Sequence, residues 1–404
     1  MLVRSESTMM ASPRSTDLPS HWNLKSNNLD FIRLFFASLV IFNHSFVIAR
    51  GARSPDPLAA ATGGALDFGE LAVDGFFIIS GFLVSQSWLN SAAIGTYIKK
   101  RALRIVPGFI AAFLVCALVV IPLGSGSWHV FVANFRLPKL VAALLLFRQY
   151  TQANAFTAVP FAGAVNGSFW TIQFECWCYA LVPLLSVIGV YRRRWLAIGL
   201  CAATMIIFER QSQGHLHLYI GVSRFIFGEP TKWPRLLFCF LCGVGFYSLK
   251  ERIPYRAGLA IACGTILVAM GMFASRQLSL AAPLFGTYIL LFLAFRPSPR
   301  FKSAARFGDF SYGTYLYGFP VQQLILYYLG ECGVGRHVPR IGPYELTLLA
   351  LPATLLVAAL SWYCVERPFL RFRRTQPTAP RFAAGANMTP IQDLPADTVI
   401  VGSP

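Results

Sequence analysis

The sequence predicts an all-α integral membrane protein with about ten transmembrane helices and both termini in the cytoplasm. Hydrophobic residues make up 55% of the 404-residue chain and charged residues 13%, a composition typical of membrane proteins. Apolar runs recur at lengths near the roughly 20 residues that a helix needs to cross a bilayer. Because lipid leaves an open sheet edge without hydrogen-bond partners, these runs are predicted to be helices.

The predicted spans follow one another with short connections. Lys and Arg gather after the second, fourth, sixth, eighth and tenth spans, and such basic connections usually face the cytoplasm. The apolar stretch 139–147 is too short to cross and is predicted to be interfacial or re-entrant. The ten spans are predicted at 31–50, 72–90, 106–123, 168–190, 196–210, 235–249, 257–274, 278–295, 311–330 and 344–365.

Three units are predicted along the chain. Residues 1–27 form a cytoplasmic N-terminal segment, 28–370 the transmembrane domain, and 371–404 a disordered cytoplasmic tail rich in Pro, Ala and Thr. The net charge of +18 lies mostly between apolar runs, so it indicates membrane orientation and not a nucleic-acid partner.

The cysteines predict neither a disulfide framework nor a metal site. Eight of the nine fall in apolar stretches, where cysteine behaves as a small hydrophobic residue, and Cys332 alone falls in a predicted external loop. Cys239 and Cys242 form a C-x-x-C without a second pair elsewhere.

Asp30, Arg33 and His44 are the first candidate site, because they interrupt the first apolar run. Ionisable groups in a membrane usually face a protein interior or a water-filled path. The eleven-residue step from Arg33 to His44 returns to within about 20° of the same helix face and rises roughly 16 Å. All three side chains are therefore predicted to point into one cleft, with His44 able to transfer a proton. The alternative is a buried histidine that hydrogen-bonds to a neighbouring helix.

The second and third candidates follow along the chain. Asp74 lies near the external end of the second span, and Ser80-Gly81 interrupts its apolar run, either for close approach of a ligand or for helix packing. Arg101 and Arg104 lie three residues apart in a predicted basic loop and share one helical face, with Pro107 following at the entry to the third span. Such an arginine pair suits phosphate recognition, although cytoplasmic orientation would also explain it.

The remaining candidates lie in the fourth, ninth and tenth spans. Glu175 has Tyr179 one turn later; the carboxylate is predicted to orient His44, to act as a second acid/base group, or to form an ion pair. Glu366 is predicted to be a structural cap. Tyrosines 312, 315 and 317 fit either a sugar site or an ordinary interfacial belt.

Six stretches, in this order, resemble acyltransferase family 3 of the membrane-bound acyltransferases. They are LDFIRLFFASLVIFNH, VDGFFIISGFLV, KKRALRIVP, SFWTIQFECWCYALVP, FSYGTYLYGFP and VERP, and together they extend from about Leu29 to Pro368. The resemblance implies a ten-helix membrane fold. It also implies transfer of an acyl group, commonly acetyl from cytoplasmic acetyl-CoA, to a glycan or lipid-linked acceptor.

The resemblance also carries residue roles to matching positions. Many members have a histidine where this chain has Gly318, so no second intramembrane histidine is assigned, and the hydrolase-like domain fused to some relatives is absent. The matching positions are His44 for the essential histidine, Arg33 for the first-span arginine, Arg101 and Arg104 for R-x-x-R, Ser80, Gly81 and Phe82 for S-G-F, and Glu175 for the glutamate after the aromatic-Trp motif.

The function that the resemblance implies is O-acyl transfer at the bacterial cytoplasmic (inner) membrane. Arg101 and Arg104, with Arg33, would hold the phosphates of acyl-CoA. His44 would act as general base or be acylated transiently. Asp30 or Glu175 would orient charged partners.

The substrates are less closely defined. The expected acceptor is a surface polysaccharide or lipid-linked oligosaccharide; a small molecule such as a macrolide, and succinyl or longer acyl groups, are alternatives. A lipid-glycan flippase or transporter is the rival class, disfavoured by the absence of an internal repeat. A membrane sensor has no signalling domain to support it. No oligomeric state is predicted.

Overall fold

The computed structural model describes residues 27–52, 54–216, 221, 224–296, 306–330 and 341–372, and within these ranges every regular element is a helix. The all-α prediction is confirmed for this part of the chain. The predicted N-terminal segment up to residue 26, the tail from residue 373 and Cys332 lie outside the described residues.

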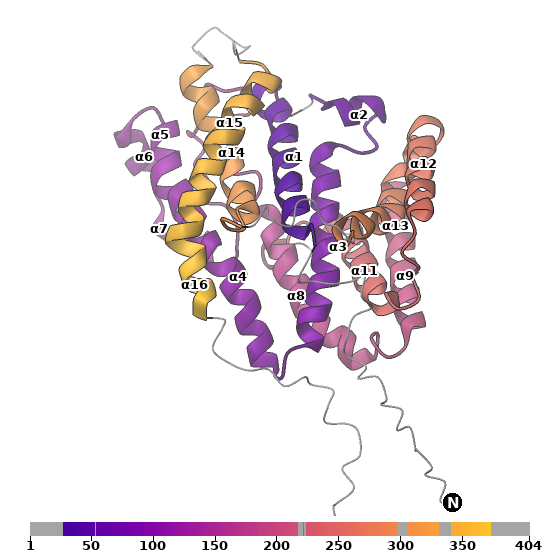
Figure 1. Ribbon diagram of the computed structural model, residues 1–404. Helices are drawn as coiled ribbons and strands as arrows, with labels where there is room; N and C mark the ends of the chain where they lie inside the picture. Colours follow the sequence, from indigo (N-terminus) through magenta and orange to yellow (C-terminus); the bar gives the residue numbers. More distant parts are fainter. Residues whose placement is uncertain are drawn as a thin grey trace, which may run out of the picture.

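Many of the helices that the structure describes follow one another with short connections, and the segment between α7 and α8 is longer and irregular (Figure 1). Their bounds are α1 Leu29–Arg50, α2 Pro57–Ala61, α3 Phe68–Leu89, α4 Ile94–Val115, η1 Cys116–Val120, α5 Ile121–Gly124, α6 Trp128–Asn134, α7 Leu137–Leu145, α8 Trp170–Ile188, α9 Arg194–Ser212, α10 Arg224–Phe227, η3 Pro230–Lys232, α11 Trp233–Leu249, α12 Ala257–Phe273, α13 Ser275–Ala294, α14 Ser311–Leu329, α15 Pro343–Ser361, η4 Trp362–Glu366 and α16 Arg367–Arg371.

Each of the ten predicted spans falls in a helix. Among the described residues, six helical stretches are long and apolar enough to cross a membrane: α1, α3, α4 through α5, α8, α13, and α15 through α16. Helix α12 is apolar but shorter. The total of ten spans and the cytoplasmic position of both ends therefore stay predictions.

The basic segment before the third span is a helix and not a loop. Helix α4 begins at Ile94, so Arg101 and Arg104 lie in its second and third turns, and Pro107 lies inside the helix and not at its entry. Proline is tolerated inside membrane helices because neighbouring groups satisfy the carbonyl that it leaves free. The short stretch predicted at 139–147 is also helical, as α7, and its interfacial or re-entrant placement stays a prediction.

Helices α3 and α11 cross with their backbones in contact. A Cβ atom on Gly81 would lie 2.1 Å from the carbonyl oxygen of Phe240, and one on Gly243 would lie 2.1 Å from that of Ile78. Small residues allow this approach, as at many helix contacts in membranes. Phe82 is fully buried beside α11 and α13, where its ring packs against Tyr247 and others. Gly81 and Phe82 thus take part in helix packing and do not line the first cavity described below, so their role in cofactor binding stays a prediction.

Helix α1 lies near the centre of the molecule and packs against α3, α14 and α15 (Figure 1). Where it meets α14, Gly318 gives the close approach, since a Cβ there would lie 2.6 Å from Cγ1 of Ile41. The Gln322 amide donates to the carbonyl of Ile41 and to the Ser45 hydroxyl, each at 2.7 Å. A histidine at position 318 would require α1 and α14 to separate.

Candidate functional site

A first cavity of about 500 Å³ lies beside the N-terminal end of α1. Its walls come from the first turns of α1, most of α3 from Val73 onward, the second and third turns of α4, the N-terminal half of α8 and the start of α14. Six of the nine predicted site residues line this cavity: Asp30, Arg33, Ser80, Arg101, Arg104 and Glu175.

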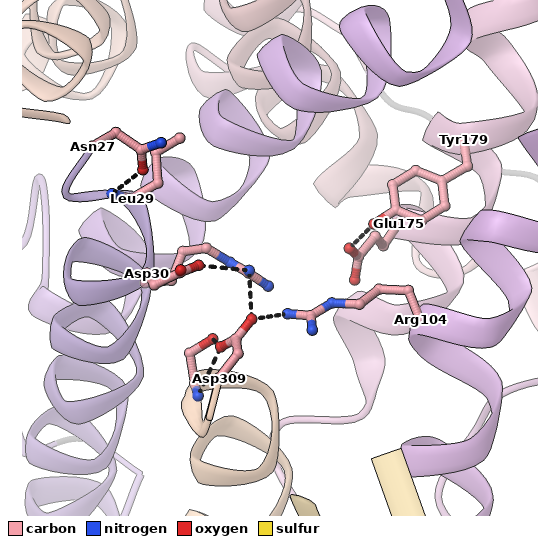
Figure 2. A network of polar contacts seen from close by, with 9 residues as sticks. Asn27, Leu29, Asp30, Arg104, Glu175, Tyr179 and Asp309 are labelled. Carbon is pink, nitrogen blue, oxygen red and sulfur yellow. Dashed lines mark hydrogen bonds and ion pairs between the residues drawn. The ribbon is translucent and has the colours of Figure 1, made fainter. Parts of the chain in front are cut away.

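Asp309, just before α14, joins two of the arginines in this cavity. Its Oδ2 atom accepts from Arg33 at 2.9 Å and from Arg104 at 2.5 Å (Figure 2). Its Oδ1 atom accepts from the Ser311 hydroxyl at 2.5 Å and holds the start of α14. Burial alone would raise the pKa of Asp309, but the Arg104 and Arg33 guanidinium groups hold this pKa below its usual value. Asp309 is therefore a fixed negative charge. Asp30 is a weaker partner, 4.0 Å from Arg33.

Arg101 differs from the other two arginines because no carboxylate pairs with it among the described residues. One terminal nitrogen donates to the Ser87 hydroxyl at 3.2 Å, and the guanidinium lies over the Tyr179 ring at 5.6 Å from its centre. Its Nε atom is buried without a hydrogen-bond partner in this part of the chain. Buried donors are rarely left unpaired, so this nitrogen is a candidate for a bound anion.

Glu175 accepts a short hydrogen bond from the Tyr179 hydroxyl one turn later on α8 (Figure 2). The predicted i, i+4 relation is therefore present, but Glu175 faces the first cavity and not His44. No ion pair to Glu175 occurs among the described residues. Ser80 lines the same cavity, and its Oγ atom is buried.

His44 lies in a second cavity of about 200 Å³. This cavity is formed by the C-terminal half of α1, the N-terminal end of α3, the start of α8, Lys232 and the first turn of α11. The imidazole packs edge-on against Phe319, with ring centres 5.1 Å apart. Its Nδ1 atom is buried, and no described residue hydrogen-bonds to it. The alternative of a histidine tied to a neighbouring helix therefore finds no support at this nitrogen.

Val73 and Tyr315 line both cavities and form the partition between them. The Tyr315 hydroxyl lies 2.7 Å from that of Thr171 and donates to the Ser168 carbonyl at 3.0 Å, so it is held against α8. The prediction that Asp30, Arg33 and His44 share one cleft was wrong. Asp30 and Arg33 line the first cavity and His44 the second, and the helical rise alone separates Arg33 from His44 by roughly 16 Å in depth.

Arg235 is the main buried cation of the second cavity. Its Nε and one terminal nitrogen donate to the two oxygens of Asp74 at 3.0 and 2.8 Å, and its other terminal nitrogen pairs with Glu70. Asp74 is only 3% exposed, so the pair balances a charge that would otherwise be costly. The predicted external end of the second span is thus fixed to α11.

Comparisons with known proteins identify the family of this chain. The sequence profile of a family described as "Acyltransferase domain" matches residues 26–365. This chain belongs to acyltransferase family 3. It is therefore a multi-pass membrane O-acyltransferase, and this favours the enzyme over the transporter. Among the described residues, no group of three His, Cys, Asp or Glu side chains is placed to hold a metal ion.

Three curated relatives of this acyltransferase extend over most of its length. It is 28% identical to "Nodulation protein 10" of Rhizobium leguminosarum bv. viciae over 86% of the chain and 94% of the relative. It is 26% identical to "O-acetyl transferase" of Shigella phage Sf6 over 86% and 96% of the two chains. It is 23% identical to "Acyltransferase MdmB" of Streptomyces mycarofaciens over 77% and 84%. No solved structure matches it significantly.

Several cavity residues of this acyltransferase were missed by the sequence analysis. Asp74 was noted, but its partner Arg235 was not. An acidic and a basic residue in two different spans is the signal that would have paired them. Asp309 lies at the start of the stretch 309–323, in which the sequence predicts site roles only for the tyrosines. Those tyrosines separate in the structure: Tyr312 and Tyr315 line the first cavity, whereas Tyr317 is buried in the core.

Glu366 has a structural setting. It is 3% exposed in the π-helical turn η4, and the Ser361 hydroxyl donates to it at 3.0 Å. This contact agrees with a structural role for the VERPF stretch.

Proposed function

We propose that this acyltransferase moves an acetyl group from cytoplasmic acetyl-CoA to a hydroxyl of a cell-surface polysaccharide or lipid-linked glycan at the bacterial cytoplasmic membrane. The observation that carries the proposal is the pair of adjoining cavities, one rich in arginine and the other holding His44. The printed name of the Shigella phage relative, an O-acetyl transferase, supports acetyl as the transferred group.

The first cavity is the proposed donor site. It holds four basic and three acidic side chains, so it favours an anion such as the coenzyme A phosphates. Arg101 is the proposed direct phosphate ligand because it lacks a carboxylate partner among the described residues. Arg33 and Arg104, fixed by Asp309, set the shape and positive charge of the wall. The pantetheine arm would run along α3 toward the partition at Val73 and Tyr315.

His44 is the proposed group that transfers the proton. As general base it removes the proton of the acceptor hydroxyl while that oxygen attacks the thioester carbonyl carbon. The C–S bond then breaks, and the coenzyme A thiolate takes the proton from the imidazolium. If His44 is instead acylated first, radiolabelled acetyl-CoA supplied without acceptor leaves label on the enzyme, and the His44→Ala variant remains unlabelled.

The proposed orientation follows from basic residues and cavity position together. The first cavity lies between the N-terminal end of α1 and the basic second and third turns of α4. The positive-inside rule favours the cytoplasmic side for this end of the cavity. The second cavity then lies closer to the external face. The donor would enter from one side of the membrane and the acceptor from the other.

The deciding experiment is NMR measurement of O-acetyl groups on cell-surface polysaccharide in the native host. Wild type is compared with a gene deletion, with His44→Ala and with His129→Ala at equal expression. His129 lies exposed on α6 and lines neither cavity, so it is a matched control. Acetyl signals should disappear in the deletion and in His44→Ala and persist in His129→Ala. Unchanged acetylation in the deletion would contradict the proposal.

A further inference from the structure

The second cavity offers several polar groups that the protein leaves unused. Asp67 caps α3 through its Oδ1 atom, which accepts the Glu70 amide at 2.6 Å, and Glu70 pairs with Arg235 through Oε1. In the described part of the chain, the other carboxylate oxygen of each makes no hydrogen bond or ion pair. The Nδ1 atom of His44 is likewise unpartnered there.

An aromatic side chain stands beside these oxygens. Trp170, at the start of α8, lines the cavity, and Lys232 lies over its ring at 5.7 Å from the centre. Carboxylates accept hydrogen bonds from hydroxyl groups, and an indole offers an apolar face with one polar edge. Together with His44, these groups offer hydrogen-bond acceptors beside an aromatic surface, and such a combination suits a polyhydroxylated ring.

The size and charge of the second cavity favour a ligand other than coenzyme A. A volume of about 200 Å³ is below the roughly 300–1,000 Å³ of pockets for drug-sized ligands, so the cavity fits about one ring. Three acidic and two basic side chains line it, the reverse of the balance in the first cavity. Arg235 is already committed to Asp74 and Glu70, so it is not free for a phosphate.

We infer that the second cavity is the acceptor site and binds one neutral sugar ring of the acceptor. Asp67 and Glu70 accept hydrogen bonds from its hydroxyl groups, Trp170 borders its apolar face, and one hydroxyl lies at His44. This inference rests on the proposed function and adds the residues that recognise the acceptor. A sugar bearing a carboxylate is disfavoured, because its charge would lie beside Asp67 and Glu70.

The test uses the purified full-length protein with acetyl-CoA and two probes, methyl glucoside and methyl glucuronide. Product is measured by mass spectrometry. The variants are Asp67→Asn, which keeps a good helix cap, and Glu70→Gln, which keeps an oxygen for Arg235. Each substitution replaces one carboxylate oxygen, a hydrogen-bond acceptor, with an amide NH2 group, a donor. Glu209→Gln, on α9 and outside both cavities, is the control for loss of a carboxylate.

We expect both cavity variants to raise the KM for methyl glucoside about tenfold or more, the usual effect of losing a hydrogen bond to a charged group. The KM for acetyl-CoA should not change, and methyl glucuronide should be the poorer acceptor for wild type. Equal kinetics for Asp67→Asn, Glu70→Gln and Glu209→Gln would overturn the inference. So would an equal rise in the KM of both substrates.

Two further outcomes separate this inference from the proposed function. If neither glycoside is acetylated while acetyl-CoA still binds in an Arg101-dependent way, the acceptor site is wrong and the donor site stands. If wild-type protein does not bind acetyl-CoA at all, the proposed function itself fails. Thermal unfolding of each variant shows whether a kinetic change reflects lost fold.

Discussion

The two cavities share four helices but differ in the balance of acidic and basic side chains that line them. Helices α1, α3, α8 and α14 contribute to both, with Val73 and Tyr315 between them. In the first cavity basic side chains outnumber acidic ones and Arg101 stays uncommitted. In the second, acidic side chains outnumber basic ones and the buried arginine is fully engaged. A cavity with spare positive charge suits the anionic donor, and one with spare carboxylate oxygens suits a hydroxylated acceptor.

The two ion-pair clusters also differ in what they stabilise. Asp74 and Arg235 have side chains only 4% and 13% exposed, and their pair joins α3 to α11. Arg33 and Asp309 are 21% and 13% exposed at the wall of an open cavity. Because the Asp74 carboxylate is more deeply buried than that of Asp309, breaking the first pair should harm the fold more, and breaking the second should harm binding more.

The largest effect is expected for His44→Ala. Loss of a positioned acid/base group lowers rates about 10²–10⁴-fold, so kcat for acetyl transfer should fall by that factor. The KM for acetyl-CoA should stay near the wild-type value, since His44 lines the other cavity. Steady-state kinetics of purified protein test this, with His129→Ala as control. A matching rise in the KM for acetyl-CoA would show that the two cavities are not functionally separate.

Arg235→Ala should be the most destabilising change among the cavity residues. It leaves the Asp74 carboxylate buried without its partner, which costs about 3–5 kcal/mol of folding free energy. The double variant Asp74→Leu with Arg235→Met removes both charges and should regain much of that loss. Thermal unfolding in detergent measures both. A single variant as stable as wild type would mean that this pair does not hold α3 to α11.

Arg101→Ala and Arg104→Ala should have different effects, although the two arginines form one motif in the sequence. Arg101→Ala should raise the Kd for acetyl-CoA about 10- to 100-fold, the effect of losing a charge-assisted contact to phosphate, without loss of stability. Arg104→Ala should also lower the unfolding temperature, because Asp309 loses its shorter partner. Isothermal titration with acetyl-CoA and thermal unfolding measure the two effects. The same change in Kd and in unfolding temperature for both variants would contradict these different roles.

Much of the helical architecture could be predicted because hydrophobicity is a property of the local sequence. All ten predicted spans lie in helices, and the i, i+4 contact of Glu175 with Tyr179 follows from helical geometry alone. The start of α4 could not be predicted, because its basic first turns have little hydropathy signal and the sequence therefore predicts a loop there.

The site was predicted less completely, because its partners come from distant helices. Asp309 lies 276 residues from Arg33, and Arg235 lies 161 residues from Asp74. A helical wheel gives the direction of a side chain but not what a neighbouring helix inserts between two residues on one face. Val73 and Tyr315 come from such neighbouring helices and line both cavities, whereas the sequence predicted a single cleft.

The smallest effect is expected for Asp309→Asn. Asparagine keeps an oxygen for Ser311 at the start of α14 but cannot attract both Arg33 and Arg104 as a carboxylate does. If Asp309 positions these arginines for the donor, the KM for acetyl-CoA should rise about two- to fivefold, which is a change of under 1 kcal/mol. If the KM falls instead, Asp309 competes with the phosphates for the same guanidinium groups. Asp309→Asn can change the KM by mispositioning the two arginines or by leaving the cavity with more net positive charge. Measuring the KM at low and high salt separates these two effects, because salt screening weakens only the effect of charge.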